Sequence, residues 1–135
     1  MAWTSTHGIG AILGSGSKFN IAVKPGFALI TPSDASQLSG EIHFQIPRPP
    51  KGYNSVYAIK LEFSSQSASV DSFAVYIGNK NKQSESNLQW TTTEQSRFAN
   101  VLALGEESGI EVVIGISFDA IGSLLKFQSV DVKYD

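Results

Sequence analysis

The chain has 135 residues, of which 41% are hydrophobic, and its ten Lys and Arg against twelve Asp and Glu give a net charge of −2. This length predicts one domain over residues 1–135 with its own hydrophobic core. The basic residues are scattered and cysteine is absent, which excludes a nucleic-acid-binding stripe, a polybasic membrane anchor, disulfides and cysteine-ligated metals.

Segments of alternating polarity, separated by Gly, Pro, Ser and Asn, predict a series of short β-strands and no helix. In chain order they cover residues 9–13, 19–23, 27–30, 41–46, 57–63, 73–77, 88–92, 98–102, 110–118 and 125–134. The polar stretch GNKNKQSESN at 78–87 is predicted to be a mobile loop.

Three of these strands carry further information. Tyr57, Ile59, Leu61 and Phe63 form the clearest alternating set, and all four are expected to face the core. Segment 110–118 is apolar on nearly both faces, as in a central strand that is covered on each side. In 125–134 the inward parity changes, which predicts a β-bulge near residues 128–129 or a change of strand partner.

The strand in IHFQIPRPP, residues 42–50, runs directly into three prolines. Proline lacks an amide hydrogen and fixes φ, so strand pairing must end at Pro47 or continue only along an edge. Residues 47–54 are therefore predicted to be a stiff crossover between two sheets. Together the strands predict an all-β fold, an antiparallel β-sandwich of about eight or nine strands, with a closed β-barrel as the alternative.

Several short motifs resemble a family of small bacterial proteins of unknown function that open Met-Ala-Trp-Thr-His-Gly. These motifs are MAWT…HG at 1–8, KPG at 24–26, IHFQIPRPP at 42–50, FAVYIGNK at 73–80 and GISFDAIG at 115–122. Here Ser5 and Thr6 are inserted before His7 and Gly8. The resemblance implies a single β-sandwich domain and brings no established activity, cofactor or catalytic residue.

Neither a signal peptide nor a membrane span is expected, because MAWTSTHGIG lacks a basic and an apolar region and the run 112–118 is too short to cross a bilayer. The expected location is cytoplasmic, or outside the cell after release without a classical signal peptide, unless a leader has been removed.

Catalytic and metal-binding motifs are weak. His7, His43 and Glu41 could share a metal only if the N-terminal segment paired with the strand that contains His43, so we expect no metal and no cofactor. Asp71 and Asp119 lie outside any Asp-rich cluster of the kind that binds calcium. No G-x-S-x-G elbow occurs, and GIGAILGSG at 8–16 lacks the ending of a phosphate-binding loop. We therefore expect a protein that is not an enzyme.

Aromatic side chains outside the core pattern remain as candidates for binding. Trp90, Tyr53 and Trp3, with Asn54 and Gln89 beside them, could stack on sugar rings or anchor a protein partner. The alternative is that both tryptophans cap the ends of the core. The sequence thus predicts a non-catalytic ligand-binding module, with carbohydrate as the leading ligand. The alternative is a structural protein that forms homo-oligomers through strand edges and apolar outer faces.

Overall fold

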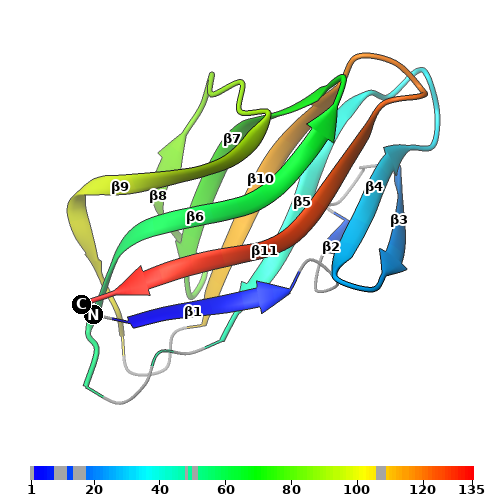
Figure 1. The fold of residues 1–135 in the computed structure, drawn as a ribbon. Coiled ribbons are helices and arrows are strands. Elements are labelled where there is room, and N and C mark those ends of the chain that lie inside the picture. The colour runs from blue at the N-terminus through cyan, green and yellow to red at the C-terminus, as the bar shows by residue number, and fades with distance from the viewer. Residues whose placement is uncertain (1, 8–11, 14–17, 48, 50–51, 106–108) are drawn as a thin grey trace.

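The computed structural model describes residues 2–7, 12–13, 18–47, 49, 52–105 and 109–135. These residues form strands and no helix, so they include no helix able to span a membrane (Figure 1). The strands are β1 (Ala2–His7), β2 (Ile12–Leu13), β3 (Phe19–Lys24), β4 (Phe27–Pro32), β5 (Ser39–Ile46), β6 (Ser55–Gln66), β7 (Ala68–Ile77), β8 (Lys80–Glu85), β9 (Thr92–Ala103), β10 (Ile110–Phe118) and β11 (Leu124–Tyr134).

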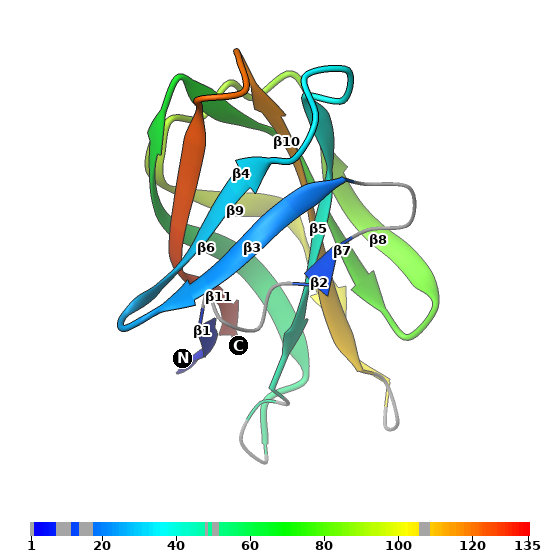
Figure 2. The same ribbon diagram turned by 90° about the vertical axis from the view of Figure 1, so that its right-hand side faces the viewer.

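The strands form two antiparallel sheets that pack face to face (Figure 2). The first, which we call the β11 sheet, has the order β3-β4-β11-β6-β9, with β1 also paired to β11. The second, the β10 sheet, has the order β2-β5-β10-β7-β8. Each sheet keeps its own edge strands, so the predicted β-sandwich is confirmed and the closed barrel is not formed. The described strands outnumber the eight or nine that were predicted.

The core lies between the two sheets and is rich in aromatic rings. Phe127 of β11 stacks on Phe63 of β6 with centroids 5.3 Å apart, and it contacts Phe44 of the opposite sheet at 5.6 Å. Such offset contacts add stability beyond the burial of apolar area itself. The alternation of apolar residues in the sequence therefore does set which face of each sheet is buried.

Strand β10 lies between β5 and β7, as expected for a central strand. Its outward positions, however, are Glu111, Val113, Gly115 and Ser117, so only Val113 places a large apolar side chain on the outer face. The prediction that this strand is apolar on nearly both faces was wrong. Its inward residues are apolar at every second position, and glycine and serine occupy part of the other face.

The predicted irregularity in the last strand is present: the strand contains a β-bulge, and it also changes its partner there. The pairing of β11 with β6 passes from Phe127↔Phe63 to Ser129↔Glu62, which leaves Gln128 as an extra residue. At the same point the other neighbour of β11 changes from β4 to β1. The bulge returns Val130, Val132 and Tyr134 to the inner face, where each is fully buried.

Two predictions about neighbouring segments were wrong. The pairing of β6 with β9 shifts between Val56 and Ala58, and this bulge places Tyr57 outside the core cluster, where Arg97 and Lys133 lie over its ring and leave it only 7% exposed. The stretch 78–87 is not simply a loop, because Lys80–Glu85 form β8 at the edge of the β10 sheet. An edge strand can be polar throughout, since only a small part of it is buried.

The proline-rich segment connects the two sheets, as predicted, since it leads from β5 to β6. Residues 48, 50 and 51 lie outside the described residues. At its start the carbonyl of Pro47 accepts a hydrogen bond from Tyr134 Oη at 3.1 Å, and Thr4 Oγ1, which donates to Tyr134 Oη at 2.9 Å, lies 3.2 Å from the same carbonyl. A side chain of β11 thus supplies the hydrogen bond that the backbone needs where β5 ends.

Candidate functional site

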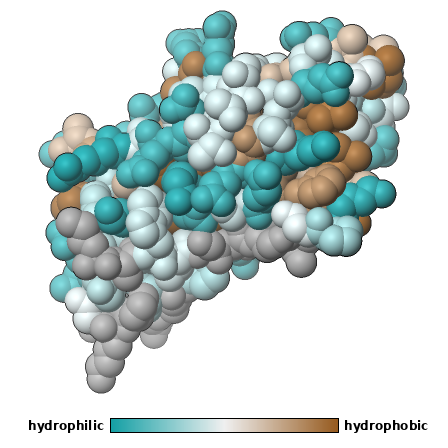
Figure 3. All heavy atoms as spheres, in the orientation of Figure 1, coloured by the Kyte–Doolittle hydropathy of each residue, from teal (hydrophilic) through white to brown (hydrophobic). Residues whose placement is uncertain are grey.

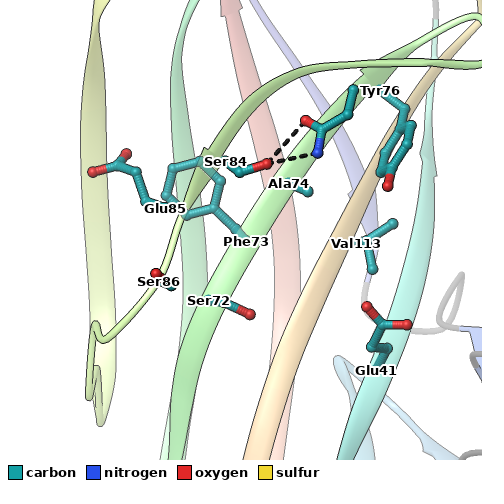
Figure 4. Close-up of a pocket in the computed structure, with 10 residues that line it drawn as sticks. Glu41, Ser72, Phe73, Ala74, Tyr76, Ser84, Glu85, Ser86 and Val113 are labelled. Carbon is teal, nitrogen blue, oxygen red and sulfur yellow. Dashed lines mark hydrogen bonds between the residues drawn. The ribbon is translucent and has the colours of Figure 1, made fainter.

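A polar hollow of about 270 Å³ lies on the outer face of the β10 sheet (Figure 4). Strands β5, β10 and β7 supply its floor, and β8 with the residues after it supplies one wall. Its lining includes Glu41, Ser72, Ala74, Tyr76, Asn81, Ser84, Glu85 and Val113. We call this the Tyr76 hollow.

The floor of the Tyr76 hollow combines an aromatic ring with a small apolar surface. Tyr76 pairs with Glu111 of β10 and is half-buried, while Val113 beside it is only 6% exposed despite its outward position. In Figure 4 the Tyr76 ring and the Glu41 carboxylate extend toward Val113 from opposite ends of the hollow. A half-buried tyrosine offers an apolar ring face and a polar hydroxyl to the same ligand.

A glycine leaves the middle of this floor without a projecting side chain. Gly115 faces Ser72 across the β7–β10 pair, and a Cβ atom on Gly115 would collide with the Ser72 hydroxyl. The absence of a side chain at Gly115 therefore leaves room for the Ser72 hydroxyl over β10. That hydroxyl lies at the edge of the hollow, where it can both donate and accept hydrogen bonds.

The wall of the Tyr76 hollow is held by side-chain hydrogen bonds. Asn81 Nδ2 donates to Ser84 Oγ at 2.7 Å within β8. Glu85 Oε2 accepts from Ser96 Oγ of β9 at 2.8 Å, a bond that ties the wall to the opposite sheet. The Glu85 carboxylate points away from the hollow, whereas Glu41 and several hydroxyl and amide groups face it (Figure 4). Such a surface suits a ligand that carries many hydroxyl groups and an apolar face.

A second hollow, of about 500 Å³, lies farther along β7 at the end of the same sheet. We call it the Asp71 hollow, and it is lined by Ser65, Ser67, Ala68, Ser69, Asp71, Gln89, Thr91 and Asp119. The Asp71 carboxylate accepts hydrogen bonds from Ser69 Oγ, at 2.7 Å, and from Ser117 Oγ. These bonds hold Asp71 on the outer face, and they join β7 to β10 beside the Gly115 position.

The aromatic candidates from the sequence lie in different parts of the molecule. Trp90 bridges to Val70 through two backbone hydrogen bonds and packs against Phe73 with ring centroids 5.9 Å apart, at the margin of the core. Gln89, its neighbour, lines the Asp71 hollow. Tyr53 also packs against the core, and Asn54 bonds through its backbone to Asp135 and Leu104.

Trp3 lies on the outer face of the β11 sheet, away from both hollows. It is 36% exposed, and the ammonium groups of Lys60 and Lys133 lie 5.0 and 5.2 Å from its ring centroid. Lys60 also bonds to Glu62 at 3.1 Å, which raises the pKa of Lys60 and lowers the pKa of Glu62. Figure 3 shows that the middle of this face is hydrophilic, whereas hydrophobic side chains gather toward its β4 end.

The residues proposed for a metal are not brought together. β1 pairs with β11 rather than with β5, so the pairing that would unite His7 with His43 is not formed, and the His7 side chain lies outside the described part. His43 Nδ1 instead lies 2.5 Å from Glu111 Oε1. Within the described ranges, no three His, Asp or Glu side chains form a group that could hold a metal ion.

Sequence reasoning missed the residues of the Tyr76 hollow except Glu41, which it considered only as a metal ligand. One signal was available for Tyr76, because it alternates with the inward Phe73, Val75 and Ile77 and so must face outward. No such signal marked Asn81 and Ser84, since β8 has no apolar alternation.

No protein-family model and no curated protein matches this sequence. Solved structures do resemble its fold. A low-affinity xylan-binding module of family CBM86 from Roseburia intestinalis matches with a TM-score of 0.61 and 10% identity, over 100% of this chain and 97% of that chain. A family 35 carbohydrate-binding module from Clostridium thermocellum matches with a TM-score of 0.53 and 14% identity, over 98% of each chain. The mosquito-larvicidal Cry4Aa toxin from Bacillus thuringiensis matches with 0.55 and 13%, over 98% of this chain and 23% of that chain. At these identities the chain shares a β-sandwich fold with all three.

Proposed function

We propose that this protein is a non-catalytic carbohydrate-binding module whose site is the Tyr76 hollow. The observation that carries the proposal is the composition of that hollow, in which a tyrosine ring, the Glu41 carboxylate and several hydroxyl and amide groups line one concavity. The xylan-binding and family 35 modules that share the fold over the full length of this chain support it.

The chemistry of the lining is suited to a sugar. The Tyr76 ring can cover the apolar C–H face of a pyranose, while Glu41 accepts hydrogen bonds from its hydroxyl groups. A hydrogen bond to a charged group contributes about 1.5–3 kcal/mol, so Glu41 can orient a sugar in a shallow site. The Asn81–Ser84 bond holds the wall in place before the ligand arrives, which reduces the entropy lost on binding.

Binding should be tested on a panel of soluble polysaccharides by affinity electrophoresis, with xylan, mixed-linkage glucan, mannan and galactan in the gel. The protein is expected to be retarded by at least one of them. Tyr76→Ala should remove the retardation, whereas Trp3→Ala, which removes an exposed ring from the opposite sheet, should leave it unchanged. No retardation by any polysaccharide, or equal loss in both variants, would refute the site.

The same polysaccharides distinguish binding from catalysis. We expect the protein to bind without cleaving, so the concentration of reducing ends should stay constant during long incubation. A rise that depends on protein concentration, and that Glu41→Gln or Glu85→Gln abolishes, would instead identify an enzyme that uses these carboxylates.

Self-assembly is a second candidate role, supported by apolar side chains at the β3–β4 end of the β11 sheet. Val23 is 62% exposed, and Phe27 and Leu29 are half-buried on β4. A contact between copies would bury these side chains. Light scattering over a range of protein concentrations tests this role: a dimer that dissociates in a Phe27→Ser variant supports it, and a monomer at every concentration refutes it.

A further inference from the structure

Two hollows lie beside the same strand, β7, and along the same edge of the β10 sheet. Tyr76 and Ser72 of β7 border the Tyr76 hollow, and Asp71 and Ser69 of the same strand border the Asp71 hollow. The wall continues likewise, from Ser84–Ser86 beside the first hollow to Gln89 and Thr91 beside the second. The two hollows therefore follow one another along β7, and the second extends over the end of the sandwich to Ser65 of β6.

The residues between the two hollows have small side chains. The floor there consists of Gly115, Ser72 and Ser117, all small, and the bulge at Asp71 keeps that carboxylate on the same outer face. From Tyr76 to Ser69 the strand advances seven residues, which at about 3.3 Å per residue corresponds to roughly 20 Å. That length accommodates several sugar rings in a row.

The charged side chains that line the two hollows are all acidic. Glu41 and Glu85 border the first hollow, and Asp71 and Asp119 border the second. Among the described residues that line either hollow there is no Lys, Arg or His; Lys80 and Lys82 of β8 lie outside both linings. Carboxylates accept hydrogen bonds from hydroxyl groups, but they repel other carboxylates and sulfates within a Debye length of about 10 Å.

We infer that the two hollows form a single track along β7 that binds an uncharged, extended glycan chain across several consecutive sugars, with Asp119 and Gln89 contacting the sugars farthest from Tyr76. This inference rests on the proposed function and specifies its ligand. A neutral polysaccharide meets acceptors along the whole track, whereas a chain of uronic acids meets like charge in both hollows.

The test is calorimetric titration with neutral xylo- and cello-oligosaccharides and with oligogalacturonides, from two to six sugars. Affinity for at least one neutral series should rise with chain length, and oligogalacturonides should bind more weakly than neutral chains of equal length. Asp119→Asn should lower the affinity for the hexasaccharide by about tenfold, the effect of one charge-assisted hydrogen bond, and leave the disaccharide unaffected. Glu94→Gln, at an exposed acid of β9 in the opposite sheet, should change neither affinity.

The outcomes separate this inference from the proposed function. Equal affinity for di- and hexasaccharides, or an Asp119→Asn variant that binds hexasaccharide like the wild type, would overturn the track and leave the Tyr76 hollow as a one-sugar site. Tighter binding of oligogalacturonides than of neutral chains would overturn the inferred preference for uncharged glycans. No binding of any oligosaccharide, together with no retardation in polysaccharide gels, would overturn both.

Discussion

The Ser72 hydroxyl occupies the space in which a Cβ atom on Gly115 would lie. The two residues face each other across the central strands of the β10 sheet, between the Tyr76 hollow and the Asp71 hollow. The shape of this surface therefore depends on a residue with no side chain of its own. Any side chain at Gly115 must compete with the serine for the same volume.

We predict that Gly115→Ala weakens glycan binding more than it weakens the fold. The Ser72 hydroxyl can rotate away from the new methyl group, so the free energy of unfolding should change by less than about 1 kcal/mol. Binding should fall, because the rotated hydroxyl no longer faces the ligand. Urea denaturation and calorimetric titration measure the two effects.

The control for Gly115→Ala is the pair Ser72→Ala and Ser72→Ala/Gly115→Ala. If the displaced hydroxyl is the cause, adding Gly115→Ala to a chain that already lacks the hydroxyl should cost no further affinity. Additive losses in the double variant would show that the methyl group itself obstructs the ligand.

Trp90→Ala is predicted to reduce stability rather than to remove a ligand contact. Trp90 packs against Phe73 and joins the end of the core, but it is only partly buried, so the loss should be about 2 kcal/mol rather than the 3–5 kcal/mol of a fully buried ring. Urea denaturation measures this loss. A variant with unchanged stability and no glycan binding would instead support the binding role that the sequence suggested for Trp90.

The sequence predicts the β-sandwich well because alternation is a property of each strand alone. In 125–134 even the bulge is visible, since Phe127 and Val130 cannot share a face without an extra residue between them. Tyr57 is a residue for which alternation predicts the wrong face of the strand. Its parity matches that of Ile59, and only the pairings of β6 with β9 and β11, which both skip Tyr57, reveal the bulge that turns it outward.

The candidate site could not be predicted from the sequence in the same way. Tyr76, Glu41 and Ser84 come from three strands, and their proximity depends on the order of strands in the sheet, which hydrophobic patterning does not specify. At Trp90 the alternative role, a cap at the end of the core, is confirmed, because the ring packs on Phe73 despite its polar neighbours in the sequence. The position of a residue within its strand predicts whether its side chain faces outward. Which outward side chains line a concave surface depends on the tertiary fold.

Glycan binding is predicted not to require a divalent metal ion. Within the described ranges no three His, Asp or Glu side chains form a group that could hold one, and Asp71 is already bonded to Ser69 and Ser117. Gel retardation should therefore be the same in EDTA and in calcium. Binding that EDTA removes and calcium restores would contradict this, and metal analysis of the purified protein would then identify the ion.

Tyr134 is predicted to limit stability at alkaline pH. Its side chain is fully buried, and its hydroxyl donates to the Pro47 carbonyl while Thr4 Oγ1 donates to it at 2.9 Å. Burial raises the pKa of Tyr134 above its ordinary 10.0, and the smaller effect of the Thr4 hydrogen bond opposes this. Because the folded state holds the proton more tightly, this contribution to stability is complete below pH 10 and is lost as the pH rises toward the folded pKa.

Tyr134→Phe should therefore be less stable than the wild type at pH 7 but should lose less stability than the wild type above pH 10. At pH 7 the variant should lose about 1 kcal/mol of stability, because the hydrogen bond to the Pro47 carbonyl is gone. Above pH 10 its free energy of unfolding should fall less steeply than that of the wild type, because residue 134 no longer titrates in the unfolded chain. Urea denaturation at pH 7, 9, 10 and 11 measures both slopes, with Tyr76→Phe, at a half-buried tyrosine, as the control. Parallel slopes for wild type and Tyr134→Phe would show that the alkaline loss arises elsewhere, for which Lys60, whose pKa is also raised, is the next group to test.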